Sequence, residues 1–286
     1  MKKKPRELRR KPNRGLDWKR ELAHRKPEDY LGAMCGTCIA EIPEEEREAS
    51  LPIGEKQNIG EEKLDCASRS VNNIAEAKLN WLLKNNKLPE KHVAFLQPYL
   101  ENSKVVLSDR WIAIMSGTDP NSGNSLLAPL DALHNFGMVP KKLFPQVDSK
   151  EEYYKTSNIT DEINRIAKES LTYFSFKYSR LSEAEMPHWL TKDMLNVGAY
   201  AWPAPRDGEY PRVPYQPNHA FIVWKNPRYL AFDNYLDENK EGDFVKKLAE
   251  DYDFLDTAYR LIIALKDPSK KLTWMDLIRQ FFGKVV

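Results

Sequence analysis

Cysteine is scarce in this 286-residue chain, which has only Cys35, Cys38 and Cys66. So small and odd a number does not provide the disulfide framework of a secreted domain, and we expect a reducing compartment. The longest apolar runs, such as 261–265, are far shorter than the roughly 20 residues that span a bilayer. The charged N-terminus also lacks the apolar stretch of a secretory signal. We therefore expect a cytoplasmic protein with no membrane partner.

The rest of the composition is that of a globular protein, with 41% hydrophobic and 11% aromatic residues. The net charge of +2 conceals an uneven distribution, because residues 1–26 hold twelve Lys or Arg against three acidic residues. Such a basic arm is either a solvated tail or a binding segment for nucleic acid, anionic lipid or an acidic protein surface. An acidic protein or a nucleic acid is therefore a candidate partner of residues 1–26.

The pattern along the chain divides it into four parts. Residues 41–60 are acidic and interrupted by Pro and Gly, which is typical of an extended loop. Residues 273–282 have the pattern of a terminal amphipathic helix. We expect a basic arm at 1–30, an extended acidic segment at 31–60, one domain at 61–268 and a C-terminal helix at 269–286.

Helices are predicted in the first half of that domain. Apolar residues recur every three or four positions from Asp65 until Pro89 ends the run, which predicts a long helix with Asp65 as its N-cap. Two shorter helices are predicted at 108–115 and 125–135, the second ending at Gly137. The charged residues 150–196 are expected to be partly helical.

Strands are predicted in the second half. Segments 196–202, 219–224 and 228–232 are short, rich in aromatic and β-branched residues, and separated by Pro, Gly or Asn. Because the helices come first and the strands second, the pattern favours an α+β fold over a wound parallel sheet.

Cys66 is the candidate nucleophile, because a helix N-terminus favours the thiolate form of a cysteine. The alternative is a small buried apolar residue at a helix start. His219 opens an apolar strand, and Asp233 ends the next one, so antiparallel pairing would bring the carboxylate beside the imidazole. We expect the helix and the imidazole to lower the pKa of Cys66 and to speed its alkylation.

The order of these residues resembles the catalytic order of papain-like cysteine peptidases: oxyanion Gln, nucleophilic Cys, base His and orienting Asn. The matching residues here are Gln57, Cys66, His219 and Asp233. The separation of 153 residues between the cysteine and the histidine is close to the roughly 130–150 of the family.

Other stretches are similar to the family in the same order, between about residues 55 and 265. Residues 107–110 resemble the "LSEQ" helix start, and Gly123 resembles the glycine of the substrate loop. Residues 218–220 resemble "GHAV", and residues 232–235 resemble "KNSW". The chain is most similar to compact prokaryotic and phage-type members.

The resemblance implies a two-lobed papain-like fold, in which a helical lobe carrying the nucleophile helix packs against an antiparallel β-rich lobe. It implies a Cys-His-Asp triad that hydrolyses peptide or isopeptide bonds of a polypeptide substrate. In that triad Cys66 attacks the carbonyl, His219 protonates the leaving amine, and Gln57 stabilises the oxyanion.

Three further residues are implied to bind substrate: Gly123, Asn124 and Asn218. No metal and no organic cofactor is implied.

Two departures from the family pattern keep an alternative open. Asp65 places a carboxylate directly before the candidate nucleophile, and Ser122 replaces a glycine of the substrate loop. With the basic arm, they fit a catalytically inactive papain-like module that serves as a structural or assembly component of a virion or another large particle. Virion association and assembly partners belong to this alternative. A nucleic-acid-binding protein is the least favoured, because no recognition fold accompanies the charge.

Cys35 and Cys38 form a C-x-x-C pair whose role stays open between a structural or incidental one, half of a shared metal site and a redox function. Pro43 and the acidic residues 44–46 follow too closely for a long helix to begin at Cys38.

Overall fold

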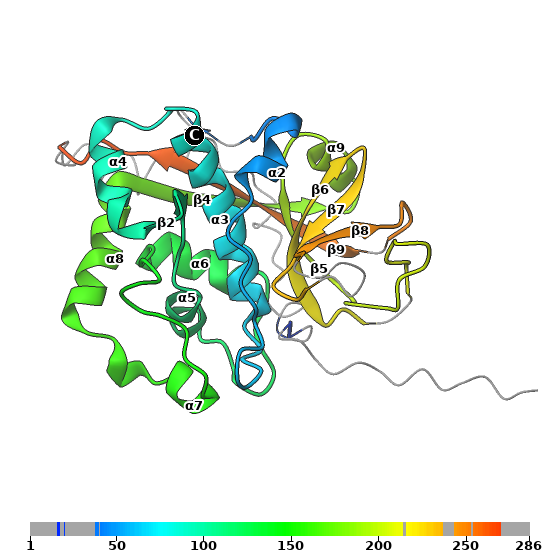
Figure 1. The fold of residues 1–286 in the computed structure, drawn as a ribbon, viewed down its shortest axis with the longest axis horizontal. Coiled ribbons are helices and arrows are strands. Elements are labelled where there is room, and N and C mark those ends of the chain that lie inside the picture. The colour runs from blue at the N-terminus through cyan, green and yellow to red at the C-terminus, as the bar shows by residue number, and fades with distance from the viewer. Residues whose placement is uncertain are drawn as a thin grey trace, which may run out of the picture.

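The computed structural model describes residues 16, 17, 20, 38–39, 41–213, 216–236, 243–252 and 254–269. Within them the fold is α+β, with most helices gathered on one side and most of an antiparallel sheet on the other (Figure 1). This agrees with the expected fold class. The predicted C-terminal helix lies outside the described residues beyond position 269, as does most of the basic arm.

The long helix α3 (Cys66–Lys84) lies at the boundary between the two sides (Figure 1). The other helices, in chain order, are η2 (Glu44–Glu46), α2 (Arg47–Ser50), α4 (Glu90–Leu96), η3 (Gln97–Tyr99), α5 (Asp109–Met115), α6 (Leu127–Phe136), α7 (Lys150–Tyr153), η4 (Thr156–Asn158), α8 (Asp161–Tyr173) and α9 (Met186–Leu190).

The main sheet is antiparallel, with the order β1-β9-β5-β6-β7-β8 and with β4 paired along the other edge of β9. Its strands are β1 (Cys38–Ile39), β4 (Phe174–Ser182), β5 (Leu195–Ala199), β6 (His219–Asn226), β7 (Arg228–Phe232), β8 (Val245–Leu248) and β9 (Phe254–Leu265). A separate small hairpin pairs β2 (Leu100–Glu101) with β3 (Lys104–Val105).

The predicted helices are present as α3, α5 and α6. Ser108 caps α5 by accepting a hydrogen bond from Trp111 N at 3.1 Å. Gly137 ends α6 with φ +77°, and a Cβ there would lie 2.3 Å from Ala167 O. Asp65 precedes α3 as expected, but its side chain makes no capping hydrogen bond, because its carboxylate binds Arg69 instead.

The strands that were not predicted include the two longest of the described sheet, β4 and β9. β4 alternates apolar and polar residues, but it follows α8 without an intervening turn, so the charged helix hid its period of two. β9 carries Arg260, whose charge interrupts the apolar pattern. In the fold Arg260 Nε lies 3.4 Å from Asp193 Oδ2, and its guanidinium lies 3.6 Å from the centre of the Trp189 ring.

The segment expected to be extended, residues 31–60, has secondary structure in its described part. β1 pairs with β9, and α2 follows η2. The guanidinium of Arg47 in α2 is buried and donates to the carbonyls of Ile42, Leu190 and Thr191. The acidic stretch therefore packs against the domain, because one buried arginine ties it to α9.

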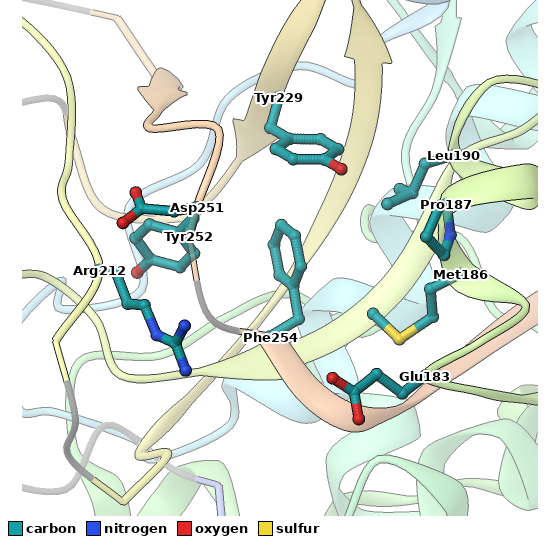
Figure 2. A pocket seen from close by; sticks show the side chains of 9 residues that line it. All are labelled: Glu183, Met186, Pro187, Leu190, Arg212, Tyr229, Asp251, Tyr252 and Phe254. Atoms are coloured by element: carbon teal, nitrogen blue, oxygen red, sulfur yellow. The ribbon is translucent and has the colours of Figure 1, made fainter.

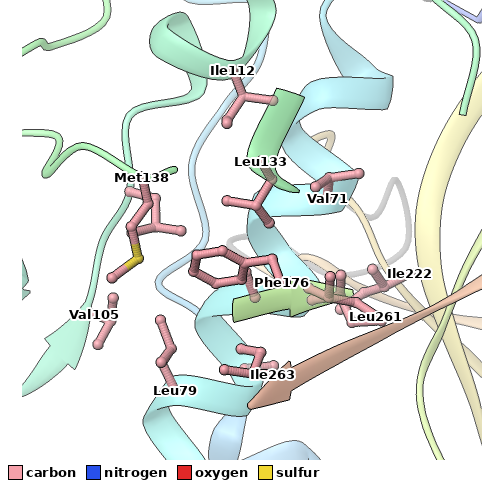
Figure 3. Close-up of a cluster of buried hydrophobic side chains, with 14 of the residues drawn as sticks. Val71, Leu79, Val105, Ile112, Leu133, Met138, Phe176, Ile222, Leu261 and Ile263 are labelled. Carbon is pink, nitrogen blue, oxygen red and sulfur yellow. The ribbon is translucent and has the colours of Figure 1, made fainter. Parts of the chain in front are cut away.

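The hydrophobic interior forms two clusters. The larger one lies among α3, α5, α6, β4 and β9, where Val71, Ile112, Leu133, Phe176 and Ile263 point toward one another (Figure 3). The smaller one fills the β-rich side around Trp202 and Phe221. The two clusters lie on opposite faces of β6, which gives Ala220, Ile222 and Trp224 to the larger and Phe221 and Val223 to the smaller.

Buried polar contacts join α3 to the β-rich side. Ser70 Oγ donates to Asn196 Oδ1 at 2.7 Å, and Lys78 Nζ lies 2.8 Å from Asp193 Oδ2. Asn73 Nδ2 donates to Asn234 Oδ1 at 2.8 Å. These contacts hold α3 against the start of β5 and against the segment after β7, in which Asp233 lies.

Candidate active site

Cys66 is the first residue of α3 and is 1% exposed. The first turn of the helix forms because the N–H groups of Ser68 and Arg69 donate to the carbonyl of Asp65. The sulfur of Cys66 accepts a hydrogen bond from the backbone N–H of Ala220, the residue after His219. The first residue of α3 therefore lies against the start of β6, the strand that His219 opens.

His219 contacts Asp233 as predicted. The register of β6 and β7 pairs Ile222 with Phe232, so His219 and Asp233 lie at the same end of the two strands. His219 Nε2 is 2.5 Å from Asp233 Oδ1, and both side chains are buried. The other ring nitrogen, Nδ1, is buried without a hydrogen-bond partner among the described residues.

Asp233 accepts several hydrogen bonds besides that of His219. Its Oδ2 accepts from the indole of Trp202 at 2.6 Å and lies 3.5 Å from Lys246 Nζ, and its Oδ1 accepts from the backbone N–H of Asn234 at 2.7 Å. Burial alone would raise the pKa of this carboxyl group, but His219 and Lys246 outweigh burial and hold the pKa well below its ordinary value. Asp233 is therefore a carboxylate.

The Cys66 thiol differs from the expectation. Burial raises its pKa well above the ordinary value, and the charges of Asp65, Glu62 and Asp233 act in the same direction. The hydrogen bond from Ala220 acts against them. The expectation of a lowered Cys66 pKa is therefore wrong for this structure. The cost of burying the thiolate outweighs the stabilisation that the helix N-terminus gives it.

The negative charge of Asp65 is balanced by neighbouring buried groups. Its carboxylate is fully buried, lies 3.0 Å from Arg69 Nε and accepts from the hydroxyl of Tyr153 at 2.5 Å. Arg69 also lies 2.8 Å from Asp109. The charge that directly precedes the candidate nucleophile is therefore part of a buried ion-pair network.

Gln57 lies beside the loop that leads into α3. Its backbone N–H donates to Asn234 O at 3.0 Å, and its Nε2 donates to Glu62 Oε1 at 2.7 Å. It is fully buried. The structure thus places Gln57 between the residue after Asp233 and the segment before Cys66.

Gly123 and Asn124 lie in a tight loop next to the first turn of α3. Gly123 has φ +89°, which favours glycine, and exchanges two backbone hydrogen bonds with Asp119. Asn124 is fully buried, and its Nδ2 donates to Thr118 Oγ1 at 2.9 Å. Thr118 in turn lies 3.4 Å from Ser68 of α3.

Part of the basic arm occupies the outer edge of this loop. Leu16 forms a parallel bridge with Asn124, and Asp17 N donates to Asn124 O at 2.7 Å. Leu16 is 2% exposed and packs with the larger hydrophobic cluster. Arg20 donates to the carbonyls of Ser116 and Gly117. The backbone edge implied to bind substrate is therefore already paired within the chain.

Asn218 precedes the candidate base and bonds the β-rich side internally. Its Oδ1 accepts from Ala201 N at 2.8 Å, and its backbone N–H donates to Ala199 O at 3.1 Å. These two bonds fix the segment that carries Trp202 beside His219.

Sequence reasoning missed three residues that surround the candidate pair. Trp202 donates to Asp233, Lys246 brings a buried positive charge, and the ring of Tyr235 lies 5.3 Å from that of His219 in a T-shaped contact. Tyr235 was noticed only as part of a motif. For Lys246 the sequence offers one signal, its position between the apolar residues Val245 and Leu248. That pattern indicates a strand, but it does not show which of the two lysines faces inward.

The pocket of Figure 2 lies away from these residues. It has a volume of about 190 Å³, with Phe254 between the aromatic and apolar walls and with Glu183, Arg212 and Asp251 at its sides. Its lining includes none of the triad candidates. Among the described residues, no group of three or more His, Cys, Asp or Glu side chains is arranged to hold a metal ion. None of the described helices combines the length and apolarity needed to cross a bilayer.

The fold is shared with papain-like cysteine proteases. A clostridial cysteine protease, Cwp84, superposes with a TM-score of 0.55 at 16% identity, covering 80% of this chain and 60% of that one. The ragweed pollen protease Amb a 11 in its proform gives 0.52 at 12% identity, covering 89% and 75%. Procathepsin L 3 of Tenebrio molitor gives 0.51 at 13% identity, covering 87% and 76%.

At these identities the likeness concerns the fold, and the chain has the papain-like fold that its sequence pattern indicated. No family model and no curated protein sequence matches the chain.

Proposed function

We propose that this chain is a cysteine peptidase that cleaves polypeptides with Cys66 as nucleophile, His219 as base and Asp233 as the residue that orients the imidazole. The observation that carries the proposal is the 2.5 Å contact between His219 and Asp233, one residue from the N–H that reaches the Cys66 sulfur. The structural likeness to cysteine proteases supports the same chemistry.

The proton has a defined route in this reaction. Nε2 of His219 faces Asp233, so Nδ1 takes the thiol proton as Cys66 attacks the carbonyl carbon, and it later gives that proton to the leaving amine. Water then attacks the acyl-enzyme and releases the second product. Gln57 and the Cys66 N–H stabilise the oxyanion with hydrogen-bond donors held in place before the reaction.

Because burial raises the pKa of Cys66, the thiol stays protonated in the closed arrangement, and attack depends on transfer of its proton to His219.

The substrate backbone binds at Gly123 and Asn124 in this proposal, with Asn218 supporting the opposite side. Asp17 already donates to the Asn124 carbonyl, so a substrate takes this edge only when Leu16 and Asp17 leave it. Because the side chain of Leu16 is buried here, we expect an apolar side chain of the substrate to take the same position. An isopeptide substrate would use the same attack on a carbonyl.

Incubation of the full chain with an unfolded protein tests the proposal, with the products identified by mass spectrometry. Cleavage that disappears in Cys66→Ala and His219→Ala is expected, because each variant removes one partner of the proton transfer. A matched control is Cys38→Ala, which leaves the cleavage unchanged. The inactive alternative predicts equal and negligible cleavage by all four proteins. Virion association, a cytoplasmic location and the partners of residues 1–26 stay predictions.

A further inference from the structure

A fully buried lysine lies against the Asp233 carboxylate. Lys246 belongs to β8, opposite Ala231 of β7, and it is 0% exposed while Lys247 next to it is exposed. Its ammonium lies 3.5 Å from Asp233 Oδ2, donates to the carbonyl of Tyr235 and sits 5.2 Å from the centre of the Trp202 ring. A buried ammonium is costly unless its charge is matched, so this position depends on Asp233.

The charge at this point matters for proton transfer. A buried carboxylate in contact with an imidazole favours the charged imidazolium, and if uncompensated it would hold the proton on the ring. A base must both take and give its proton near the working pH. The positive charge of Lys246 on the far oxygen of Asp233 offsets the carboxylate, so the pair beside His219 has a net charge of zero.

We propose that Lys246 is a positioning residue of the active site, which acts through Asp233 to keep the proton affinity of His219 in a range where the imidazole both accepts and releases a proton. The proposal rests on the proposed function of the Cys66 and His219 pair. Lys246 touches no reacting atom in it. Its indirect action follows from the order of contacts, in which Asp233 binds His219 through Oδ1 and faces Lys246 through Oδ2.

The other ionisable groups around this cluster come from different elements. Asp65, Glu62 and Asp233 all act on the Cys66 thiol, and the ring of Tyr235, from the segment after β7, contacts that of His219 while its hydroxyl donates to Glu62. Asp65 is already matched by Arg69. The carboxylates among these groups carry the same sign of charge as Asp233, and the protonated thiol and the phenol are neutral, so none of them replaces the positive charge of Lys246.

NMR titration of the His219 ring in the full chain tests the proposal. The ring signals are assigned by their absence from His219→Gln. In Lys246→Met the midpoint of the titration moves to higher pH by about one unit or more, a tenfold or greater rise in proton affinity, because one charge is removed within two contacts of the ring. The acid limb of the cleavage profile, where protonated His219 no longer takes the thiol proton, moves in the same direction.

Lys78→Met is the matched control. Lys78 is also buried and lies 2.8 Å from a buried aspartate, Asp193, but that aspartate does not contact His219. Both variants lose stability, and only Lys246→Met moves the His219 midpoint. A midpoint that stays in place in folded Lys246→Met overturns the proposal. Because the titration needs no cleavage, it can be read even if the proposed peptidase function fails.

A double variant covers the case in which Lys246→Met does not fold. Lys246→Met with Asp233→Asn removes both charges and leaves no stranded ion, and its His219 midpoint is expected near that of the wild type. A midpoint displaced as far as in Asp233→Asn alone would show that the charge of Lys246 has no effect on the ring and would overturn the proposal.

Discussion

Replacing Asp233 by Asn exchanges one oxygen for an NH₂ group and disturbs two partners. The Asn oxygen can still accept from His219, but its NH₂ group then stands where Oδ2 accepts from Trp202 Nε1 at 2.6 Å, so two donors face each other. The same change removes the negative charge 3.5 Å from the ammonium of Lys246. An aspartate therefore suits this position because both of its oxygens accept hydrogen bonds.

The cost follows from these contacts. At an effective dielectric constant of about 20, opposite charges at this separation attract by about 4–5 kcal/mol. Removing one partner of a buried ion pair typically costs about 3–5 kcal/mol, because the other charge stays buried without compensation. An unfolding free energy of about 5–15 kcal/mol is typical of a domain, so the variant is expected to fold with most of its stability margin lost.

Urea unfolding of the wild type, Asp233→Asn and the double variant with Lys246→Met measures this cost. We expect a loss of about 3–5 kcal/mol in the single variant and recovery of much of that loss in the double variant. The acid limb of the cleavage profile of the single variant should also move to lower pH, since a neutral amide favours the imidazolium less. A single variant within about 1 kcal/mol of the wild type, or a double variant less stable than the single one, would refute the reasoning.

Three further predictions concern stability. Leu16→Ala should cost about 2–5 kcal/mol in urea unfolding, because the side chain packs in the larger cluster, whereas an arm that only trails from the domain predicts no loss. Tyr153→Phe removes the hydroxyl that donates to buried Asp65 and should cost about 1–3 kcal/mol, so an unchanged urea midpoint would contradict that contact. The folded pKa of Asp233 is depressed, so its stabilisation is present above the ordinary aspartate pKa of about 3.9 and is lost as pH falls through the folded value. The stability difference between wild type and Asp233→Asn should therefore shrink in acid, and a difference that grows below about pH 4 would reverse the sign.

The sequence predicted the features that depend on local pattern. The start of α3 at Cys66 and the pairing of β6 with β7 follow from apolar periodicity and turn residues, and they are sufficient to bring His219 to Asp233. The order of residues along the chain then indicated the papain-like fold. These features can be predicted without knowledge of the tertiary contacts.

What the sequence did not predict depends on contacts between distant segments. In the sequence Lys246 is one of two adjacent lysines. Successive side chains of a strand point to opposite faces, and only the position of β8 in the sheet shows that Lys246 is the one facing Asp233. The raised pKa of Cys66 results from burial by several elements together, which outweighs its helix position. Leu16 lies in a segment that composition describes as a charged arm, yet it packs beside Asn124.

The central claim is that Cys66 cleaves peptide bonds with the help of His219, and cleavage of an unfolded protein is its most direct test. The measurement compares the full chain, the variant Leu16→Ala with Arg20→Ala, which removes two contacts that hold the arm on the Asn124 loop, and the same variant carrying Cys66→Ala. The account predicts peptide products from the first two proteins, more from the second, and none from the third. Absence of products from all three, or equal products with and without the Cys66 sulfur, would contradict it.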